Sequence, residues 1–188
     1  MCKKLSICTS LLVALLLLCP AAVGQDDEVG YLRTRISPSV AGVFIDGKYY
    51  GTAAMFGFRD KAIPLKPGDY TVKIVDPRYK TLEAKVKITT GNYATIRRQL
   101  SPLNNQPEGP FGELETNGFG NAAVYLNGKY YANTKELSSP VRTLLLNPGT
   151  YEMKIVGTDG DVERDEKITI NADETLVINR IGAIVRRR

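Results

Sequence analysis

The stretch that decides the fold is residues 43–51, which read Val-Phe-Ile-Asp-Gly-Lys-Tyr-Tyr-Gly. It recurs as residues 124–131, which read Val-Tyr-Leu-Asn-Gly-Lys-Tyr-Tyr. Asp-Gly and Asn-Gly are preferred two-residue loops of a type I′ β-hairpin, because both central positions need a positive φ angle. Three β-forming residues precede each loop and a tyrosine pair follows it. The sequence therefore predicts two copies of one hairpin. Their turn residues are Asp46, Gly47, Asn127 and Gly128.

A two-residue loop sets the register of the hairpin strands. Phe44 should face Tyr49, and Val43 should face Tyr50. The same pairings are expected of Tyr125 with Tyr130 and of Val124 with Tyr131. Because neighbouring side chains of a strand point to opposite faces, one tyrosine of each pair should enter the core and the other should point away from it.

A second repeated signal is a Pro-Gly pair, at Pro67-Gly68 and again at Pro148-Gly149. Proline suits the first central position of a turn and glycine the second, which favours a type II turn at both places. Alternating apolar residues follow each pair, with Val72 and Ile74 in the first copy matching Met153 and Ile155 in the second. The spacing between matching segments changes by only one residue along the chain, so the sequence predicts a tandem duplication.

Each copy contains about seven short alternating segments separated by turn residues, which is the pattern of a β-sandwich. The predicted fold class is all-β, with two tandem small antiparallel β-sandwich domains after a signal peptide. The predicted parts are a signal peptide at residues 1–24, domain 1 at 25–102, a Pro-rich linker at 103–110, domain 2 at 111–183 and a basic tail at 184–188. The linker favours two halves that fold separately, and it allows either a loose or a packed tandem.

The N-terminal residues have the order of an export signal. Lys3 and Lys4 precede an apolar run over residues 5–18, and small residues follow at 22–24. We therefore expect cleavage after Gly24, an exported chain in the periplasm or at the cell surface, and no membrane span in the mature chain. Lipidation at Cys19 or a retained anchor are the alternatives.

Composition argues against several classes of protein. The formal net charge is only +5 and falls by two when Lys3 and Lys4 leave with the leader, which argues against nucleic-acid binding. The chain has no His, and its three Cys lie within the first 19 residues. A mature chain without these groups has no imidazole base and no thiol nucleophile or ligand, so we predict no enzyme activity, no metal site and no cofactor. A hydrolase built on converging carboxylates remains the third possible class.

The order Gly-x-Leu-x-Thr at residues 30–34, the hairpin at 43–48 and Leu-x-Pro-Gly-x-Tyr-x-Val at 65–72 resembles the PEGA domain. The resemblance covers residues 30–100 and, by the repeat, 111–183. It implies small β-sandwich modules of bacterial or archaeal exported proteins, with an accessory or interaction role and no catalytic residues.

The candidate binding residues are the hairpin aromatics Phe44, Tyr49, Tyr125 and Tyr130. If exposed, these rings could stack on a sugar or anchor a protein partner, whereas the alternative is cross-strand packing. Two further segments each allow a functional and a structural interpretation. The acidic residues at 159–163 form either a cation site or a solvated turn. The arginines at 186–188 either contact an anionic polymer or form a disordered tail.

These observations favour a non-enzymatic interaction or scaffolding protein of the cell envelope, built from two PEGA-like modules. The alternative is a protein that binds cell-wall or surface polysaccharide through exposed tyrosines. The expected partner is accordingly an envelope protein or a surface polysaccharide.

Overall fold

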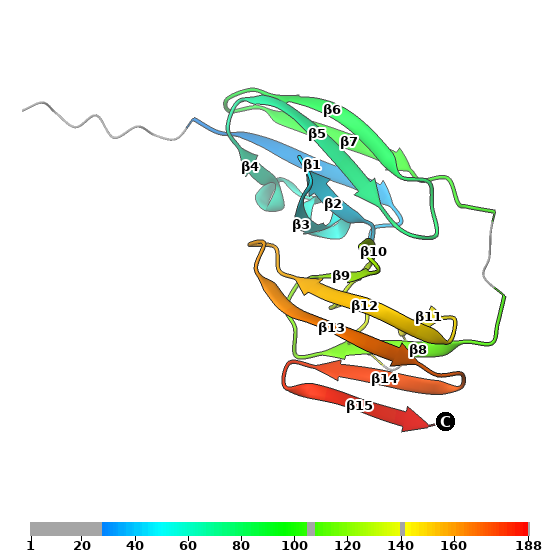
Figure 1. The fold of residues 1–188 in the computed structure, drawn as a ribbon. Helices are drawn as coiled ribbons and strands as arrows, with labels where there is room; N and C mark the ends of the chain where they lie inside the picture. Colours follow the sequence, from blue (N-terminus) through cyan, green and yellow to red (C-terminus); the bar gives the residue numbers. More distant parts are fainter. Residues whose placement is uncertain (1–27, 105–107, 140–141, 188) are drawn as a thin grey trace, which may run out of the picture.

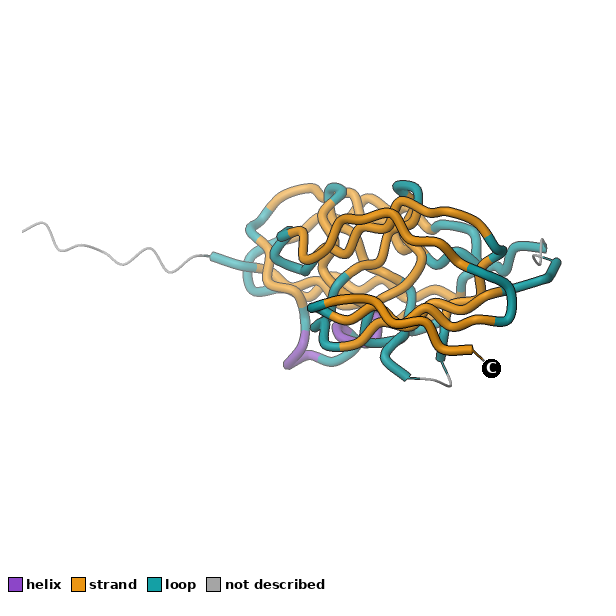
Figure 2. The backbone as a smooth tube through the Cα atoms, turned by 60° about the horizontal axis from the view of Figure 1, so that its bottom comes forward, coloured by secondary structure: helices purple, strands orange, loops and turns teal. Residues whose placement is uncertain are grey.

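A computed structural model of the chain describes residues 28–104, 108–139 and 142–187. These residues form two β-sandwich units (Figure 1). Figure 2 shows strands joined by loops through the described residues, with short 3₁₀ turns η1 (Ala53–Phe56) and η2 (Arg59–Lys61) at one place. The predicted leader and Cys19 lie outside the described residues. Among the described residues, no helix is both long enough and apolar enough to cross a bilayer.

The two units share one strand order, to which the second unit adds a strand at one edge. The strands of the first unit are β1 (Gly30–Ser37), β2 (Gly42–Ile45), β3 (Lys48–Thr52), β4 (Ile63–Leu65), β5 (Gly68–Val75), β6 (Leu82–Ile88) and β7 (Tyr93–Gln99). Those of the second unit are β8 (Gly112–Asn117), β9 (Ala123–Leu126), β10 (Lys129–Asn133), β11 (Leu144–Leu146), β12 (Gly149–Val156), β13 (Val162–Ile170), β14 (Glu174–Asn179) and β15 (Gly182–Arg187). In the first unit, one sheet has the order β4-β1-β7 and the other β3-β2-β5-β6; in the second unit the corresponding orders are β11-β8-β14-β15 and β10-β9-β12-β13.

The all-β prediction with two units is confirmed, but the sheets are not purely antiparallel. β1 pairs with β7 in parallel, and β8 pairs with β14 in the same way. The reason is the path of the chain: β7 returns to β1 only after the chain has crossed to the other sheet, and such a crossover is what a parallel pair requires.

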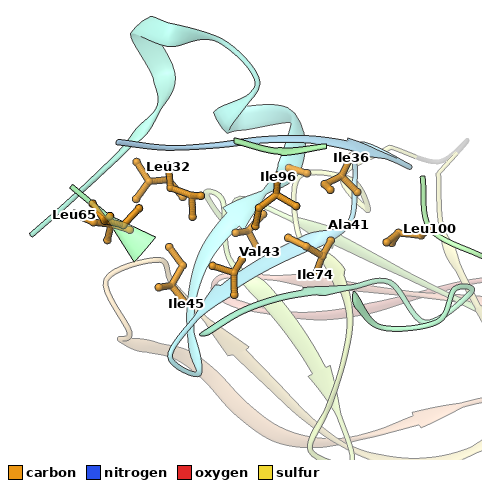
Figure 3. Packing of buried hydrophobic residues seen from close by; sticks show 13 residues of the cluster. Leu32, Ile36, Ala41, Val43, Ile45, Leu65, Ile74, Ile96 and Leu100 are labelled. Carbon is orange, nitrogen blue, oxygen red and sulfur yellow. The ribbon is translucent and has the colours of Figure 1, made fainter. Parts of the chain in front are cut away.

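Each unit has its own hydrophobic core between its two sheets. In the first unit, alternate residues of β1 point inward and meet branched side chains of β2, β5 and β7 (Figure 3). The labelled core residues are Leu32, Ile36, Ala41, Val43, Ile45, Leu65, Ile74, Ile96 and Leu100. A matching cluster in the second unit includes Leu114, Val124, Leu126, Met153, Ile155 and Ile178. The first of the short alternating segments predicted in each copy is thus confirmed as a strand with one buried face.

The threonine of the Gly-x-Leu-x-Thr motif has a structural role that both units repeat. The Thr34 hydroxyl is buried and donates to the Ala53 carbonyl at 3.0 Å, and the Thr116 hydroxyl donates to the Thr134 carbonyl at 2.9 Å. Each bond ties the first strand of a unit to the segment that follows its hairpin. The motif therefore stabilises the sandwich.

Both predicted hairpin turns are confirmed. Asp46 and Gly47 have φ angles of 48° and 83°, and Asn127 and Gly128 have φ angles of 49° and 75°. The side chains of Asp46 and Asn127 also form hydrogen bonds that turn propensity does not predict. Asp46 Oδ1 accepts a hydrogen bond from the Thr71 backbone N–H at 2.8 Å, and Asn127 Oδ1 accepts from the Glu152 N–H at 2.9 Å. Each turn is therefore anchored to the neighbouring strand.

The predicted hairpin register is right near the turn and wrong beyond it. Phe44 faces Tyr49 and Tyr125 faces Tyr130, as expected. A β-bulge then shifts the register, so that Val43 faces Gly51 and Val124 faces Ala132. Tyr50 and Tyr131 are the extra residues of the two bulges, and each packs against the core of its own unit.

The predicted type II turns at Pro67-Gly68 and Pro148-Gly149 are wrong. Gly68 and Gly149 have nearly extended φ angles of 159° and 157° and already begin β5 and β12, whereas a type II turn needs about +80°. A tyrosine closes each connection instead. The Tyr70 hydroxyl donates to the Lys66 carbonyl at 2.9 Å, and the Tyr151 hydroxyl donates to the Asn147 carbonyl at 2.8 Å.

The predicted disordered tail is also wrong for the described residues. Gly182–Arg187 forms β15, which pairs antiparallel with β14 over its full length. The second unit therefore extends beyond residue 183. Alternation in Ile184-Val185-Arg186 is too short to predict a strand, and the arginines obscure it; pairing with β14 decides the structure.

We expect Gly47→Val to destabilise the first unit by about 1–2 kcal/mol, because a β-branched residue is strained in the left-handed backbone region, at φ near +83°. The position is otherwise open, since a Cβ atom there would meet nothing within 4 Å. Denaturant unfolding of the full chain measures the loss, and Gly47→Asn, which tolerates positive φ, is the matched control. Equal stability of both variants would contradict the strain.

Candidate functional site

The feature that the sequence did not predict is a third hydrophobic cluster, shared by both units. It consists of Phe44 on β2, Tyr49 on β3, Ala123 on β9 and Tyr130 on β10, and we call it the junction. Each aromatic ring has at most 8% of its surface exposed. Figure 1 shows β9 and β10 of the second unit against β2 and β3 of the first. The junction therefore holds the two units together.

The rings of the junction meet at aromatic contact distances. The Phe44 ring lies 5.3 Å from the Tyr49 ring within its own hairpin, and 5.4 Å from the Tyr130 ring of the other unit in a T-shaped arrangement. The Tyr49 and Tyr130 rings are 5.7 Å apart across the two units. Edge-to-face and tilted pairs at these distances are the favourable geometries of aromatic rings.

The repeat explains why these residues meet. Phe44 and Tyr49 occupy the same places in the first hairpin as Tyr125 and Tyr130 occupy in the second. Each hairpin sends one tyrosine into its own core and the other away from it, as alternation predicted. The outward tyrosines then bury each other. Equivalent hairpins thus contact each other as equivalent surfaces do in a two-fold dimer.

One hydrogen bond crosses the junction at its centre. The Asn133 Nδ2 group of the second unit donates to the Tyr49 hydroxyl at 2.8 Å, and both residues are buried. Burial raises the pKa of the Tyr49 hydroxyl to about 12, since the tyrosinate would lose its hydration there. The hydroxyl therefore stays neutral in the folded chain.

Tyr130 lies in a different environment. Burial raises the pKa of its hydroxyl as well, and the adjacent Tyr49 hydroxyl raises it further. Among the described residues, this hydroxyl is the one buried side-chain polar atom that forms no hydrogen bond of normal geometry. Its ring lies against the backbone of β2, where a Cβ atom added to Gly42 would come within 2.7 Å of Tyr130 Cζ. The absence of a side chain at Gly42 is therefore what lets the second unit approach so closely.

Charged residues border the junction. Arg78 binds the buried carboxylate of Asp76 through two bonds, from Nε to Oδ1 at 3.0 Å and from Nη2 to Oδ2 at 2.7 Å. This pairing raises the pKa of Arg78. The same guanidinium lies 3.8 Å from Glu136 Oε1 of the second unit. Burial raises the pKa of Glu136, although the Arg78 charge opposes this shift. A polar border thus spans the two units beside the apolar junction.

The structure does not expose the predicted binding aromatics. Phe44, Tyr49 and Tyr130 are buried between the units, and Tyr125 is partly buried at the edge of the junction. Exposed ring faces are therefore wrong for the first three. The alternative, cross-strand packing, is confirmed within each hairpin, and packing between the two units is added to it. A single hairpin cannot reveal this, because the covering surface comes from residues some eighty positions away.

An open hollow of about 440 Å³ lies on the outer face of β9, β12 and β13, beside Tyr125. Two of its charged lining residues are paired with each other, with Lys154 Nζ 3.0 Å from Asp165 Oδ2, and the third, Glu152, lies 4.0 Å from Lys167 Nζ. It therefore offers an open surface on which the charges are paired.

The acidic segment at residues 159–163 forms the turn before β13 and the first residues of that strand. The Asp161 N–H donates to Asp159 Oδ1 at 3.0 Å, and Glu163 Oε2 accepts from Arg180 at 2.8 Å. Within the described ranges, no group of three or more acidic, His or Cys side chains is placed to hold a metal ion.

We expect the two hydroxyls of the junction to respond oppositely to removal. Tyr49→Phe should cost about 1–3 kcal/mol, because it leaves the buried Asn133 amide without its acceptor. Tyr130→Phe should be neutral or stabilise the chain by up to about 1 kcal/mol, because it removes an unpaired buried hydroxyl. Each variant is the size-matched control of the other in denaturant unfolding. Equal losses would contradict this assignment of partners.

Comparison with known proteins places the first unit in a family. The family model of the PEGA domain matches residues 30–104. No curated protein matches the chain. Among solved structures, a match is the TIE protein of Bacillus anthracis, with 20% identity and a TM-score of 0.28. That match covers 81% of this chain and 33% of the other, so the chain spans about a third of the length of that structure. The resemblance predicted for residues 30–100 is confirmed, while the second unit repeats the strand order of the first. Residues 30–104 of this chain are therefore a PEGA domain.

Proposed function

We propose that this chain is a non-enzymatic interaction or scaffolding protein of the cell envelope, exported by the leader at residues 1–24. PEGA domains occur in extracellular and envelope proteins, which supports the compartment. The partner would be an envelope protein or a surface polysaccharide, and nucleic acid is not expected from the small net charge.

The observation that carries this proposal is the junction. Two small sandwiches joined by a linker would move independently, but rings buried between them hold them in one relative orientation. The chain then presents the outer faces of both units in a fixed arrangement. A scaffold or spacer needs this property, whereas a loose pair of binding modules does not.

The ionisable groups of the described residues support a structural role. Three of the described carboxylates are buried, and each is held by a neighbouring donor: Asp76 by Arg78, Glu113 by Thr175 and Glu115 by Arg186. Each of these carboxylates therefore spends hydrogen-bonding capacity on a contact within the fold. We therefore infer no hydrolytic role for these groups.

The carbohydrate alternative is not favoured by the geometry. A sugar ring could stack on Phe44, Tyr49 or Tyr130 only if the two units separated. The alternative therefore predicts that opening the junction increases glycan binding, whereas the scaffold proposal predicts that it does not.

The test is affinity capture from envelope fractions with the full chain as bait, followed by mass spectrometry. We expect a defined partner that the full chain captures and that Tyr130→Ala, which should open the junction, captures poorly although both units stay folded. The same two proteins are applied to a glycan microarray. Saturable glycan binding that Tyr130→Ala increases and Tyr49→Ala abolishes would replace the scaffold with the carbohydrate function.

Export is tested separately, by the intact mass of the processed chain. We expect a mature chain that starts at Gln25. A chain that starts at Cys19 and carries lipid would make the protein a membrane-anchored lipoprotein instead.

A further inference from the structure

The two units differ at one edge of one sheet. In the second unit, β15 lies beside β14 and completes the four-stranded sheet β11-β8-β14-β15 (Figure 1). The equivalent sheet of the first unit, β4-β1-β7, ends at β7, and no described strand pairs with the far side of β7. The first unit thus has a vacant strand position that the second unit fills with its own chain.

The backbone of β7 faces this position. The Tyr31 N–H donates to the Asn92 carbonyl at 2.9 Å, and the Leu100 N–H donates to the Ser37 carbonyl at 2.8 Å. The backbone groups of the even-numbered residues from Asn92 to Leu100 therefore form hydrogen bonds with β1. Because backbone groups alternate in direction along a strand, those of Thr95 and Arg97 point away from β1. The Arg97 carbonyl accepts a hydrogen bond from Arg98 Nη1 at 2.9 Å, which an added strand would replace. A sheet edge that no strand covers is a template for another strand.

The second unit shows how such a strand is seated. Tyr31 pairs with Tyr93 as Glu113 pairs with Thr175, which aligns β7 with β14 residue by residue. Thr175 faces Arg186 of β15 and Val177 faces Ile184. An added strand on β7 would accordingly run antiparallel to it and face Tyr93 and Thr95 at these two positions.

Charge identifies the chemistry of the missing strand. In the second unit, Arg186 Nη2 of β15 reaches across β14 to Glu115 Oε2 on β8 at 2.7 Å, and Glu115 is only 2% exposed. The place of Glu115 in the first unit is taken by Arg33. Arg35 and Arg97, both exposed, face each other on the same surface. The sign of the charge is reversed, so the complementary strand would carry carboxylates.

Aromatic side chains add an apolar contact to this edge. The Tyr31 and Tyr93 rings stack with centroids 5.0 Å apart, and Tyr93 is 39% exposed. The guanidinium groups of Arg33 and Arg59 lie over the Tyr93 ring at 5.2 and 5.3 Å. The surface beside the open edge is therefore an ordered array of rings and cations.

We propose that the open edge of β7 binds an extended acidic peptide segment of a partner protein as an additional antiparallel strand. A second copy of this chain fits less well, since β7 or β15 of that copy would bring Arg97 or Arg186 against Arg33 and Arg35. This proposal rests on the interaction role proposed above and names its partner chemistry. The peptide test below can fail while the envelope role stands.

The test uses the full chain and two synthetic, capped and dye-labelled peptides. One has the native sequence of residues 182–187, and the other is the same peptide with Arg186→Glu and Arg187→Glu. We expect the acidic peptide to bind at least about tenfold more tightly by fluorescence anisotropy, as one charge-assisted hydrogen bond would produce. We also expect it to slow amide hydrogen exchange at Thr95 and Arg97, measured by NMR.

Three variants distinguish the addition of a strand to β7 from non-specific electrostatic attraction of the peptide. Thr95→Pro removes an N–H group on the open edge and should abolish binding, because proline is tolerated there but cannot pair with an added strand. Arg33→Glu with Arg97→Glu should reverse the preference toward the basic peptide. Lys85→Glu with Lys87→Glu on β6 changes the net charge equally and should change neither preference nor exchange. Equal binding of both peptides, no protection at Thr95 and Arg97, or an equal effect of the β6 variant would each overturn the proposal.

Discussion

Tyr130→Ala is expected to lower the free energy of unfolding of the full chain by about 3–5 kcal/mol, the usual cost of removing a buried aromatic ring. The ring is only 8% exposed and contacts Phe44 and Tyr49 across the two units. Its loss leaves a cavity that neither rigid hairpin can fill. The two units should then unfold in separate transitions, whereas the unsubstituted chain should unfold in one.

Denaturant unfolding measures the stability, and small-angle scattering measures the radius of gyration, which should increase when the units separate. Tyr93→Ala is the matched control, because it removes an exposed ring outside the junction and should cost about 1 kcal/mol or less. If both variants lose equal stability and scatter alike, the junction does not hold the units together.

Gly42→Val should produce the second large effect, a loss toward the upper end of about 1–3 kcal/mol, as overpacking of a buried site causes. A Cβ atom at this position would lie 2.7 Å from Tyr130 Cζ and 2.9 Å from its hydroxyl oxygen. The ring cannot move aside, since Phe44 and Tyr49 enclose it. The substitution should therefore push the second unit away from β2 while leaving the core of the first unit intact.

The readout is again unfolding together with scattering. Gly120→Val is the control, because a Cβ atom there would meet nothing within 4 Å. Adding Tyr130→Ala to Gly42→Val should cost much less than Tyr130→Ala alone, since the two changes remove the same contact. Fully additive losses would show that Gly42 acts on its own unit and not through the junction.

The sequence alone determined much of the local structure. Asp46-Gly47 and Asn127-Gly128 form the predicted turns, because few residue pairs accept positive φ at both positions. The short alternating segments predicted strands with one buried face, and β1 is such a strand, since side chains of a strand alternate in direction. The tandem duplication and the resemblance to PEGA domains could also be predicted from the sequence, because they depend only on the order of residues.

Where the sequence misled, two local conformations competed. A Pro-Gly pair suits a type II turn, but at Gly68 the chain is already extended because β5 pairs with its neighbours. Arginine-rich residues at the end of the chain suit a disordered tail, but the open edge of β14 pairs with them as β15. In both cases hydrogen bonding to a neighbouring strand decided the outcome.

The candidate site depended on tertiary structure altogether. The sequence identified Phe44, Tyr49, Tyr125 and Tyr130 as the residues of interest and predicted that one tyrosine of each pair leaves its own core. It could not show that the outward tyrosines cover each other, since Tyr49 and Tyr130 are 81 positions apart and meet only after both units fold. Alternation reports the face on which a side chain lies; only the packing of one unit on the other decides whether that face meets solvent or protein.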